Sequence, residues 1–110
     1  MGIVSDIPEV PSIALGTANI SLIEMVTAYA SISNGGNSIK PYMIQKITDQ
    51  NGTILYQAKP KYEGRVASSQ SIKNLQQMMG KVLIDGTGAG FSNYAIPFNI
   101  IGKTGTTQNN

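Results

Sequence analysis

The sequence of 110 residues contains neither cysteine nor histidine, and it carries few charges. Without cysteine it forms no disulfide and has no thiol nucleophile. Without histidine it lacks an imidazole base, so a Ser-His-Asp hydrolase and nearly every zinc site are excluded within this chain. Charged residues make up 13% of the sequence, about half the usual share in a globular domain. Any nucleophilic chemistry here must therefore use lysine or a group supplied from elsewhere.

Long apolar runs and basic clusters are also missing. No apolar run approaches the roughly 18 residues that span a bilayer, and no signal peptide opens the sequence. These features fit a cytosolic protein, and they fit equally a segment cut from the middle of an exported one. The eight basic residues are scattered and the net charge is +2, which argues against nucleic-acid binding and against an anionic membrane surface.

Two segments have the pattern of amphipathic helices. Ser21 and Glu24 form a Ser-x-x-Glu capping box at the start of the first, which the Asn-Gly-Gly run of residues 34–36 ends. The second is predicted to begin after Ser68 and to stop at the glycine-rich run 85–90, interpreted as a flexible link. The apolar faces at helical spacing are Leu22, Met25, Val26, Tyr29 and Ile32 in the first helix, and Ile72, Leu75, Met79, Val82 and Leu83 in the second.

The remaining segments indicate strands and connections. Residues 42–48 and 53–57 are rich in β-branched and aromatic side chains, and the Asn51-Gly52 turn between them predicts a β-hairpin. Residues 1–20 are predicted to be an irregular lead-in and residues 58–67 a polar connection, whereas 98–101 are predicted to form a strand. The fold class is therefore α+β, with antiparallel strands packed with helices. Only about three strands are available to cover two apolar helix faces, so we expect further polypeptide to complete the domain.

The candidate site is the Lys103-Thr104-Gly105 triplet that follows this last strand. A strand ending in these residues lines a cleft with a cation and hydroxyl groups, and Thr106 adds a second hydroxyl. Lys103 suits a carboxylate ligand, while Gly105 lets a substrate backbone approach the strand edge. The triplet alone also describes a solvent-exposed strand end with a lysine reaching into water, which is the commoner case.

A phosphate-binding loop is excluded as the source of this triplet. Such a loop needs glycine five residues before Gly102, and Pro97 stands there. It also needs a following helix, which residues 105–110 do not favour. The glycine run 86–90 likewise lacks the spacing of a dinucleotide-binding loop.

The order of these features resembles the C-terminal half of the transpeptidase domain of class A, bifunctional penicillin-binding proteins. Residues 11–17 are similar to the segment that precedes a helix in that family. Residues 21–36 are similar to its T/S-x-x-E-M-x-x-A-Y-A-x-x-x-N-G-G pattern, and the hairpin after Pro41-Tyr42 also resembles the family. Residues 103–107, Lys-Thr-Gly-Thr-Thr, resemble the class A form, because class B members more often have alanine at the place of Thr107. Serine β-lactamases share the triplet but do not resemble residues 12–36.

The resemblance implies a partial serine transpeptidase/β-lactamase-like fold, incomplete in this chain, with residues 1–110 as the C-terminal portion of the domain. It implies a peptidoglycan D,D-transpeptidase that works by serine acyl transfer without a cofactor or metal. The implied partners are stem peptides ending in D-Ala-D-Ala, β-lactams and the remainder of the transpeptidase domain. The implied location is the extracytoplasmic, periplasmic face of the bacterial membrane, with the membrane reached only through other parts of the parent protein.

The resemblance also assigns residue roles. Lys103 would act in proton transfer, the Thr106 backbone N–H would be half of an oxyanion hole, and Lys103, Thr104, Gly105 and Thr106 would bind the substrate or the β-lactam. The family also needs Ser-x-x-Lys and Ser-x-Asn, and no serine of this sequence fits either spacing. The nucleophile is therefore expected outside this chain, which alone should be inactive. The alternative is a non-catalytic domain that keeps the fold and binds cell-wall peptide or a partner protein.

Overall fold

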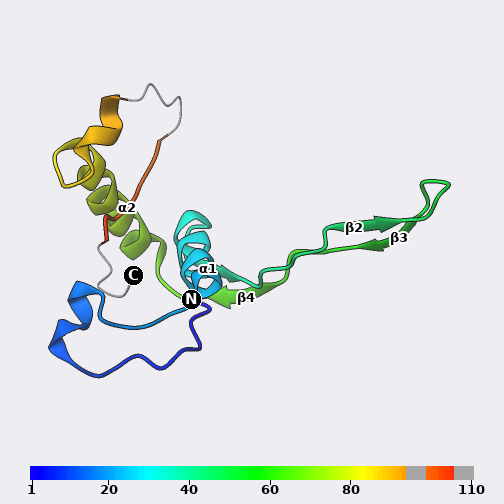
Figure 1. Cartoon of the computed structure of the whole chain (residues 1–110), viewed down its shortest axis with the longest axis horizontal. Helices are drawn as coiled ribbons and strands as arrows, with labels where there is room; N and C mark the ends of the chain where they lie inside the picture. The colour runs from blue at the N-terminus through cyan, green and yellow to red at the C-terminus, as the bar shows by residue number, and fades with distance from the viewer. Residues whose placement is uncertain (94–98, 106–110) are drawn as a thin grey trace. The chain divides into compact units, whose positions relative to one another are not determined.

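The computed structural model describes residues 1–93 and 99–105, without the side chains of residues 92 and 93. The chain divides into two compact units. The first unit contains residues 1–7 and 19–67, and the second contains residues 8–18 together with the described residues from Ser68 onward. Helices and small antiparallel sheets are both present (Figure 1), which confirms the α+β fold class.

Helix α1 of the first unit spans Leu22–Ser33 and begins with the predicted capping box. The Ser21 hydroxyl accepts a hydrogen bond from the Glu24 N–H, and the Glu24 carboxylate accepts one from the Ser21 N–H. The helix ends at Asn34, where Gly35 and Gly36 adopt φ values of 64° and 90°. These values lie in the left-handed region that glycine tolerates best, so the predicted stop is confirmed.

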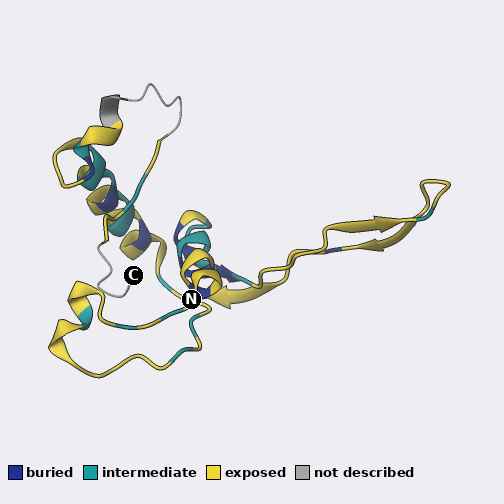
Figure 2. Cartoon of the chain, in the orientation of Figure 1, coloured by how far each residue is buried: buried dark blue, intermediate teal, exposed yellow. Residues whose placement is uncertain are grey.

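The face that α1 buries overlaps only in part with the apolar face that its spacing indicated, since Ile32 is buried and Tyr29 is half-buried but Leu22, Met25 and Val26 are exposed. The residues of α1 that are buried are Glu24, Thr27, Ala28, Ser31 and Ile32. This face packs against strand β1, Asn37–Ile39. Leu22 and Val26, by contrast, are 80% and 54% exposed. Figure 2 shows the contrast between the two sides of the helix. Within the first unit, small and polar side chains therefore make the helix contact, and the apolar face stays largely open.

The strands of the first unit form one long ribbon of two ladders. Strand β1 pairs antiparallel with β4, Tyr62–Arg65, and β2, Lys46–Thr48, pairs antiparallel with β3, Ile54–Gln57. The predicted hairpin is thus confirmed with shorter strands, but the prediction of a polar connection over residues 58–67 is wrong. Pro41 and Pro60 lie between the two ladders, and proline has no N–H to donate to a ladder. The two prolines account for the interruption.

The tip of the ribbon is held by Asp49. Its carboxylate accepts hydrogen bonds from the N–H groups of Asn51 and Thr53 at 2.9 and 2.8 Å, and its carbonyl accepts from Gly52 at 3.1 Å. Gly52 has a φ of 84°, which a residue with a side chain rarely adopts. The Asn-Gly signal therefore works here as a turn closed by Asp49 and a left-handed glycine.

The second unit is organised by helix α2, Ser69–Ile84, which begins after Ser68 as predicted and is capped by the Ser68 side chain. Its predicted apolar stripe is confirmed: Ile72 and Met79 are buried, and Leu75, Val82 and Leu83 are half-buried. Two short 3₁₀ helices belong to the same unit, η1 at Pro11–Leu15 and η2 at Ala89–Asn93. The predicted irregular lead-in therefore holds one short helical turn.

The strand predicted for residues 98–101 is not present in its described part. Residue 98 lies outside the described residues, and residues 99–105 form no ladder with another strand. A long backbone hydrogen bond of 3.4 Å, from the Gly102 N–H to the Met79 carbonyl, links them to α2. A strand is defined by its pairing, and this segment lies beside a helix, so the sequence pattern predicted the wrong element. Across the described residues, no helix has the length and apolar character needed to cross a membrane.

Candidate functional site

The Lys103-Thr104-Gly105 triplet is exposed at the end of the described chain. The Lys103 Nζ donates a hydrogen bond of 2.8 Å to the carbonyl oxygen of Thr104, the next residue. The ammonium group therefore lies along its own backbone, at the Thr104 carbonyl. A cation and a hydroxyl on one exposed segment are groups that suit an anionic ligand.

A threonine from another part of the second unit joins the triplet. The Thr87 and Thr104 hydroxyl oxygens are 2.6 Å apart, a hydrogen bond between residues 17 positions apart in the chain. Thr87 lies in the Gly86–Gly90 run directly after α2. Sequence reasoning assigned no role to Thr87, because nothing in the spacing connects it with Thr104.

The Gly86–Gly90 run forms a hydrogen-bonded turn rather than the simple link that was predicted. The Gly88 N–H donates to the Val82 carbonyl at 2.9 Å, and the Phe91 N–H donates to the Gly88 carbonyl at 3.0 Å. A Cβ placed on Gly86 would lie 2.8 Å from the Val82 Cα, and one on Gly88 would lie 2.8 Å from the Leu83 side chain. The two glycines therefore allow the turn to press against the end of α2, with Thr87 between them.

Part of the predicted site falls outside the described residues. Thr106 and Thr107 lie there, so the oxyanion-hole N–H and the second carboxylate-binding hydroxyl remain predictions. Lys103, Thr104 and Gly105 are described, and the Lys103 side chain bonds the Thr104 backbone carbonyl. Among the described residues, no three metal-ligating side chains come together.

A second polar cluster surrounds Glu24 in the first unit. Its carboxylate accepts hydrogen bonds from the N–H and hydroxyl groups of Ser5 and Ser21 and from the Val4 N–H, at 2.5–2.9 Å. The hydroxyls of Ser21 and Ser5 contribute most to holding the pKa of Glu24 well below its ordinary value, and backbone N–H donors add to this. The sequence predicted only the Ser21 half of this cluster. It binds the N-terminal segment to α1, and all its donors are satisfied within the protein, so its role is structural.

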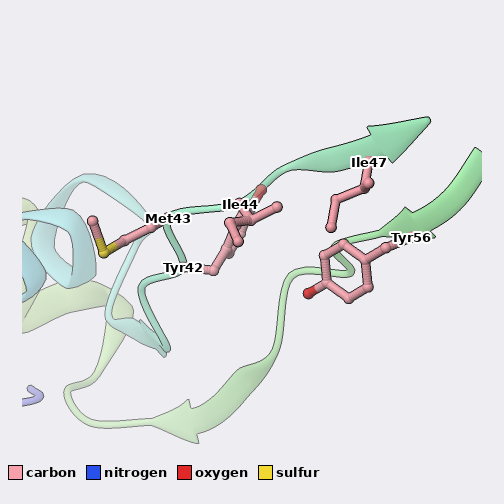
Figure 3. A pocket seen from close by; sticks show the side chains of 5 residues that line it. All are labelled: Tyr42, Met43, Ile44, Ile47 and Tyr56. Atoms are coloured by element: carbon pink, nitrogen blue, oxygen red, sulfur yellow. The ribbon is translucent and has the colours of Figure 1, made fainter. Parts of the chain in front are cut away.

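A shallow apolar depression of about 330 Å³ lies on the ribbon of the first unit. Figure 3 shows the side chains that line it. They are Tyr42, Met43, Ile44, Ile47 and Tyr56. Ile47 and Tyr56 are opposite one another in the β2–β3 ladder, so they share a face of the ribbon. The depression contains no charged group, and it lacks the chemistry of a catalytic site.

Comparison with known proteins identifies the family. Residues 9–110 match the penicillin binding protein transpeptidase domain. The chain is 34% identical over 113 residues to penicillin-binding protein 2D of Bacillus subtilis (strain 168), covering 97% of this chain and 16% of that protein. It is 33% identical over 101 residues to penicillin-binding protein 1B of Escherichia coli (strain K12), covering 92% and 12%. It is 33% identical over 97 residues to penicillin-binding protein 1A of Aquifex aeolicus (strain VF5), covering 88% and 13%.

The resemblance to penicillin-binding proteins, which rested on the order of motifs, is confirmed by these matches. The chain spans only 12–16% of the length of these three relatives, so the match concerns one part of each of them. The family match nonetheless covers almost the whole of this sequence. The chain therefore belongs to the penicillin-binding protein transpeptidase domain family.

Proposed function

We propose that this chain supplies the Lys-Thr-Gly segment of the active site of a class A peptidoglycan D,D-transpeptidase. The observation that carries the proposal is that Lys103 and Thr104 are both exposed, with the Lys103 ammonium on the Thr104 carbonyl. Their segment is bonded to α2 through Gly102 and to the turn after α2 through Thr87. The family match supplies the reaction class. The substrates are stem peptides ending in D-Ala-D-Ala, and β-lactams bind in the place of the donor peptide.

The proposed reaction is serine acyl transfer. A serine hydroxyl attacks the carbonyl of the penultimate D-alanine and loses its proton to a nearby base, and the terminal D-alanine leaves as the protonated amine. An acceptor amine then attacks the acyl-enzyme and releases the cross-linked peptide and the free serine. Lys103 lowers the energy of the negative charge near the nucleophile and takes part in proton transfer. The Thr106 N–H is half of the oxyanion hole, and loss of one such donor costs about a hundredfold or more in turnover.

The nucleophile is proposed to come from polypeptide upstream of this segment, because no serine here has the Ser-x-x-Lys or Ser-x-Asn spacing. The same polypeptide, the remainder of the transpeptidase domain, would cover the apolar face of α1, where Leu22 is 80% exposed. Residues 1–110 are then the C-terminal portion of a domain on the extracytoplasmic, periplasmic side of the membrane.

Labelling with a fluorescent penicillin tests this assignment. The 110-residue chain alone should stay unmodified, whereas the longer protein that carries this segment should be labelled once, on an upstream serine. Lys103→Ala in the longer protein should greatly slow the labelling. Stoichiometric labelling of a serine within residues 1–110 would refute the upstream nucleophile, and normal labelling of the Lys103→Ala protein would refute the role of the triplet.

The second candidate is a non-catalytic domain that keeps the transpeptidase fold and binds cell-wall peptide or a partner protein. The absence of both serine motifs from the sequence favours it as an alternative. The polypeptide that precedes this segment discriminates the two functions. Ser-x-x-Lys followed by Ser-x-Asn there supports the enzyme, and other residues at those places support the binding domain.

A further inference from the structure

Thr87 has no place in the serine, lysine and oxyanion chemistry described above, yet its hydroxyl lies 2.6 Å from that of Thr104. Both hydroxyl groups are exposed, so water is available to each of them as a partner. Their mutual hydrogen bond therefore reflects where the turn after α2 places Thr87. The Lys103 ammonium contacts the same residue, because it donates a hydrogen bond of 2.8 Å to the Thr104 carbonyl.

We propose that Thr87 is a positioning residue for carboxylate recognition, which orients the Thr104 hydroxyl toward the terminal carboxylate of the donor peptide or β-lactam. The assignment rests on the proposed function, because it takes Thr104 to be a ligand of that carboxylate. It adds a residue outside the Lys-Thr-Gly segment to the binding site.

The direction of the hydrogen bond follows from the ligand. A threonine hydroxyl has one proton to donate, and an ionised carboxylate can only accept. When Thr104 donates to a carboxylate, its proton is no longer available to Thr87. Thr87 must then donate to the Thr104 oxygen. A hydroxyl that accepts a hydrogen bond becomes a stronger donor, so this arrangement strengthens the bond from Thr104 to the carboxylate.

The surroundings of Thr87 are suited to this task. Gly86 and Gly88 bring the turn against the backbone of Val82 and the side chain of Leu83, where a Cβ on either glycine would lie at 2.8 Å. Gly88 is buried, and its N–H is bonded to the Val82 carbonyl at 2.9 Å. The turn on both sides of Thr87 is therefore held by packing and hydrogen bonds, which reduces the entropy lost when the hydroxyl pair binds a ligand.

The test uses the longer protein that carries this segment with the upstream serine motifs. The acylation rate is measured with benzylpenicillin, which carries a carboxylate, and with its methyl ester, which does not. Thr87→Val removes the hydroxyl and keeps the shape, whereas Thr87→Ser keeps the hydroxyl. Thr48→Val, at an exposed threonine of β2, is the matched control, and Lys103→Ala tests the site itself.

Thr87→Val should slow acylation by benzylpenicillin by about 3- to 10-fold, the typical effect of one hydrogen bond. It should slow acylation by the ester less, because the uncharged ester carbonyl accepts a weaker hydrogen bond than a carboxylate does. Thr87→Ser and Thr48→Val should match the unmodified protein. Equal slowing with both compounds would show a general structural effect and overturn the inference, as would an unchanged rate with benzylpenicillin. If Lys103→Ala has no effect, the proposed function fails first and the role of Thr87 fails with it.

Discussion

Helices α1 and α2 both begin at a capping serine, but the two serines have different surroundings. Replacing each serine with aspartate should therefore have different effects on the two helices. Ser21 caps α1 and also donates its hydroxyl proton to the Glu24 carboxylate at 2.5 Å. Ser68 caps α2 by accepting from the Ser71 N–H at 3.0 Å, and its hydroxyl is hydrogen-bonded to the Ser71 hydroxyl at 2.8 Å. Aspartate caps helices about as well as serine does in general. We therefore expect Ser68→Asp to be tolerated and Ser21→Asp to destabilise α1.

The expected sizes follow from these contacts. Alanine at either position removes a cap, which costs about 1 kcal/mol. Aspartate at position 68 restores the cap, and its charge at the helix N-terminus contributes roughly a further 0.3–1 kcal/mol. Aspartate at position 21 cannot donate to Glu24 and places a second negative charge against its carboxylate. Ser21→Asp should therefore be no more stable than Ser21→Ala, whereas Ser68→Asp should exceed Ser68→Ala by about 1 kcal/mol or more.

Amide hydrogen exchange is the appropriate assay because it reports on each helix separately. A change of about 1 kcal/mol alters exchange protection roughly fivefold, since 1.4 kcal/mol corresponds to a factor of ten. The α1 amides should lose protection in Ser21→Asp, and the α2 amides should keep it in Ser68→Asp. If Ser21→Asp protects α1 as well as serine does, the Glu24 carboxylate does not lie against residue 21, and the described cluster is wrong.

Three further predictions concern other parts of the chain. Gly86→Ala should lower the melting temperature, because the new Cβ would lie 2.8 Å from the Val82 Cα, whereas Gly90→Ala meets open space and should leave it unchanged. The hydrogen bonds to Glu24 lower its pKa from the ordinary value of 4.5, so the stability it contributes is present above about pH 4.5 and is lost as the pH falls toward the folded-state pKa. Acid titration of α1 exchange should show this loss, and Glu24→Gln should lack it. Met43, 102% exposed, makes little contact in the folded chain, so Met43→Ser should reduce the binding of a hydrophobic dye without changing the melting temperature.

Elements that depend on neighbours in the sequence were predictable. The capping box of α1, the cap and apolar stripe of α2 and the turn at residues 49–52 all arise from side chains within a few positions of one another. Such contacts form whatever the rest of the fold does. For these elements the sequence pattern and the structure agree to within a few residues.

Elements that depend on distant partners were not predictable. Strand β4, Tyr62–Arg65, was taken as a connection because its composition is polar and it contains Gly64. It is a strand because it pairs with β1, about 25 residues earlier in the chain. The same reason explains why Val4 and Ser5 were missed as partners of Glu24, 20 and 19 residues away.

In α1, the residues that the hydrophobic pattern indicates as a buried face differ in part from the residues that are buried within the unit. Of the face that the pattern indicated, the unit buries Ile32 but leaves Leu22 and Val26 exposed, and it buries Thr27, Ala28 and Ser31 beside Ile32. Small side chains let β1 and the N-terminal segment approach the helix closely. Gly2, for example, lies against the methyl group of Thr27. The proposed function accounts for the exposed apolar residues by a larger contact with the remainder of the transpeptidase domain.

The Gly-Thr-Gly run after α2 is a further case in which packing, and not the local sequence pattern, determines the role of a residue. Glycine is common in turns because of its conformational freedom, and this reason led to the interpretation of residues 86–90 as a link. Neither Gly86 nor Gly88 is among the glycines with positive φ. A Cβ on Gly86 would lie 2.8 Å from the Val82 backbone, and a Cβ on Gly88 would lie 2.8 Å from the end of the Leu83 side chain and 3.2 Å from the Val82 carbonyl oxygen. The glycines therefore act through close packing, and close packing is what places the Thr87 hydroxyl within reach of Thr104.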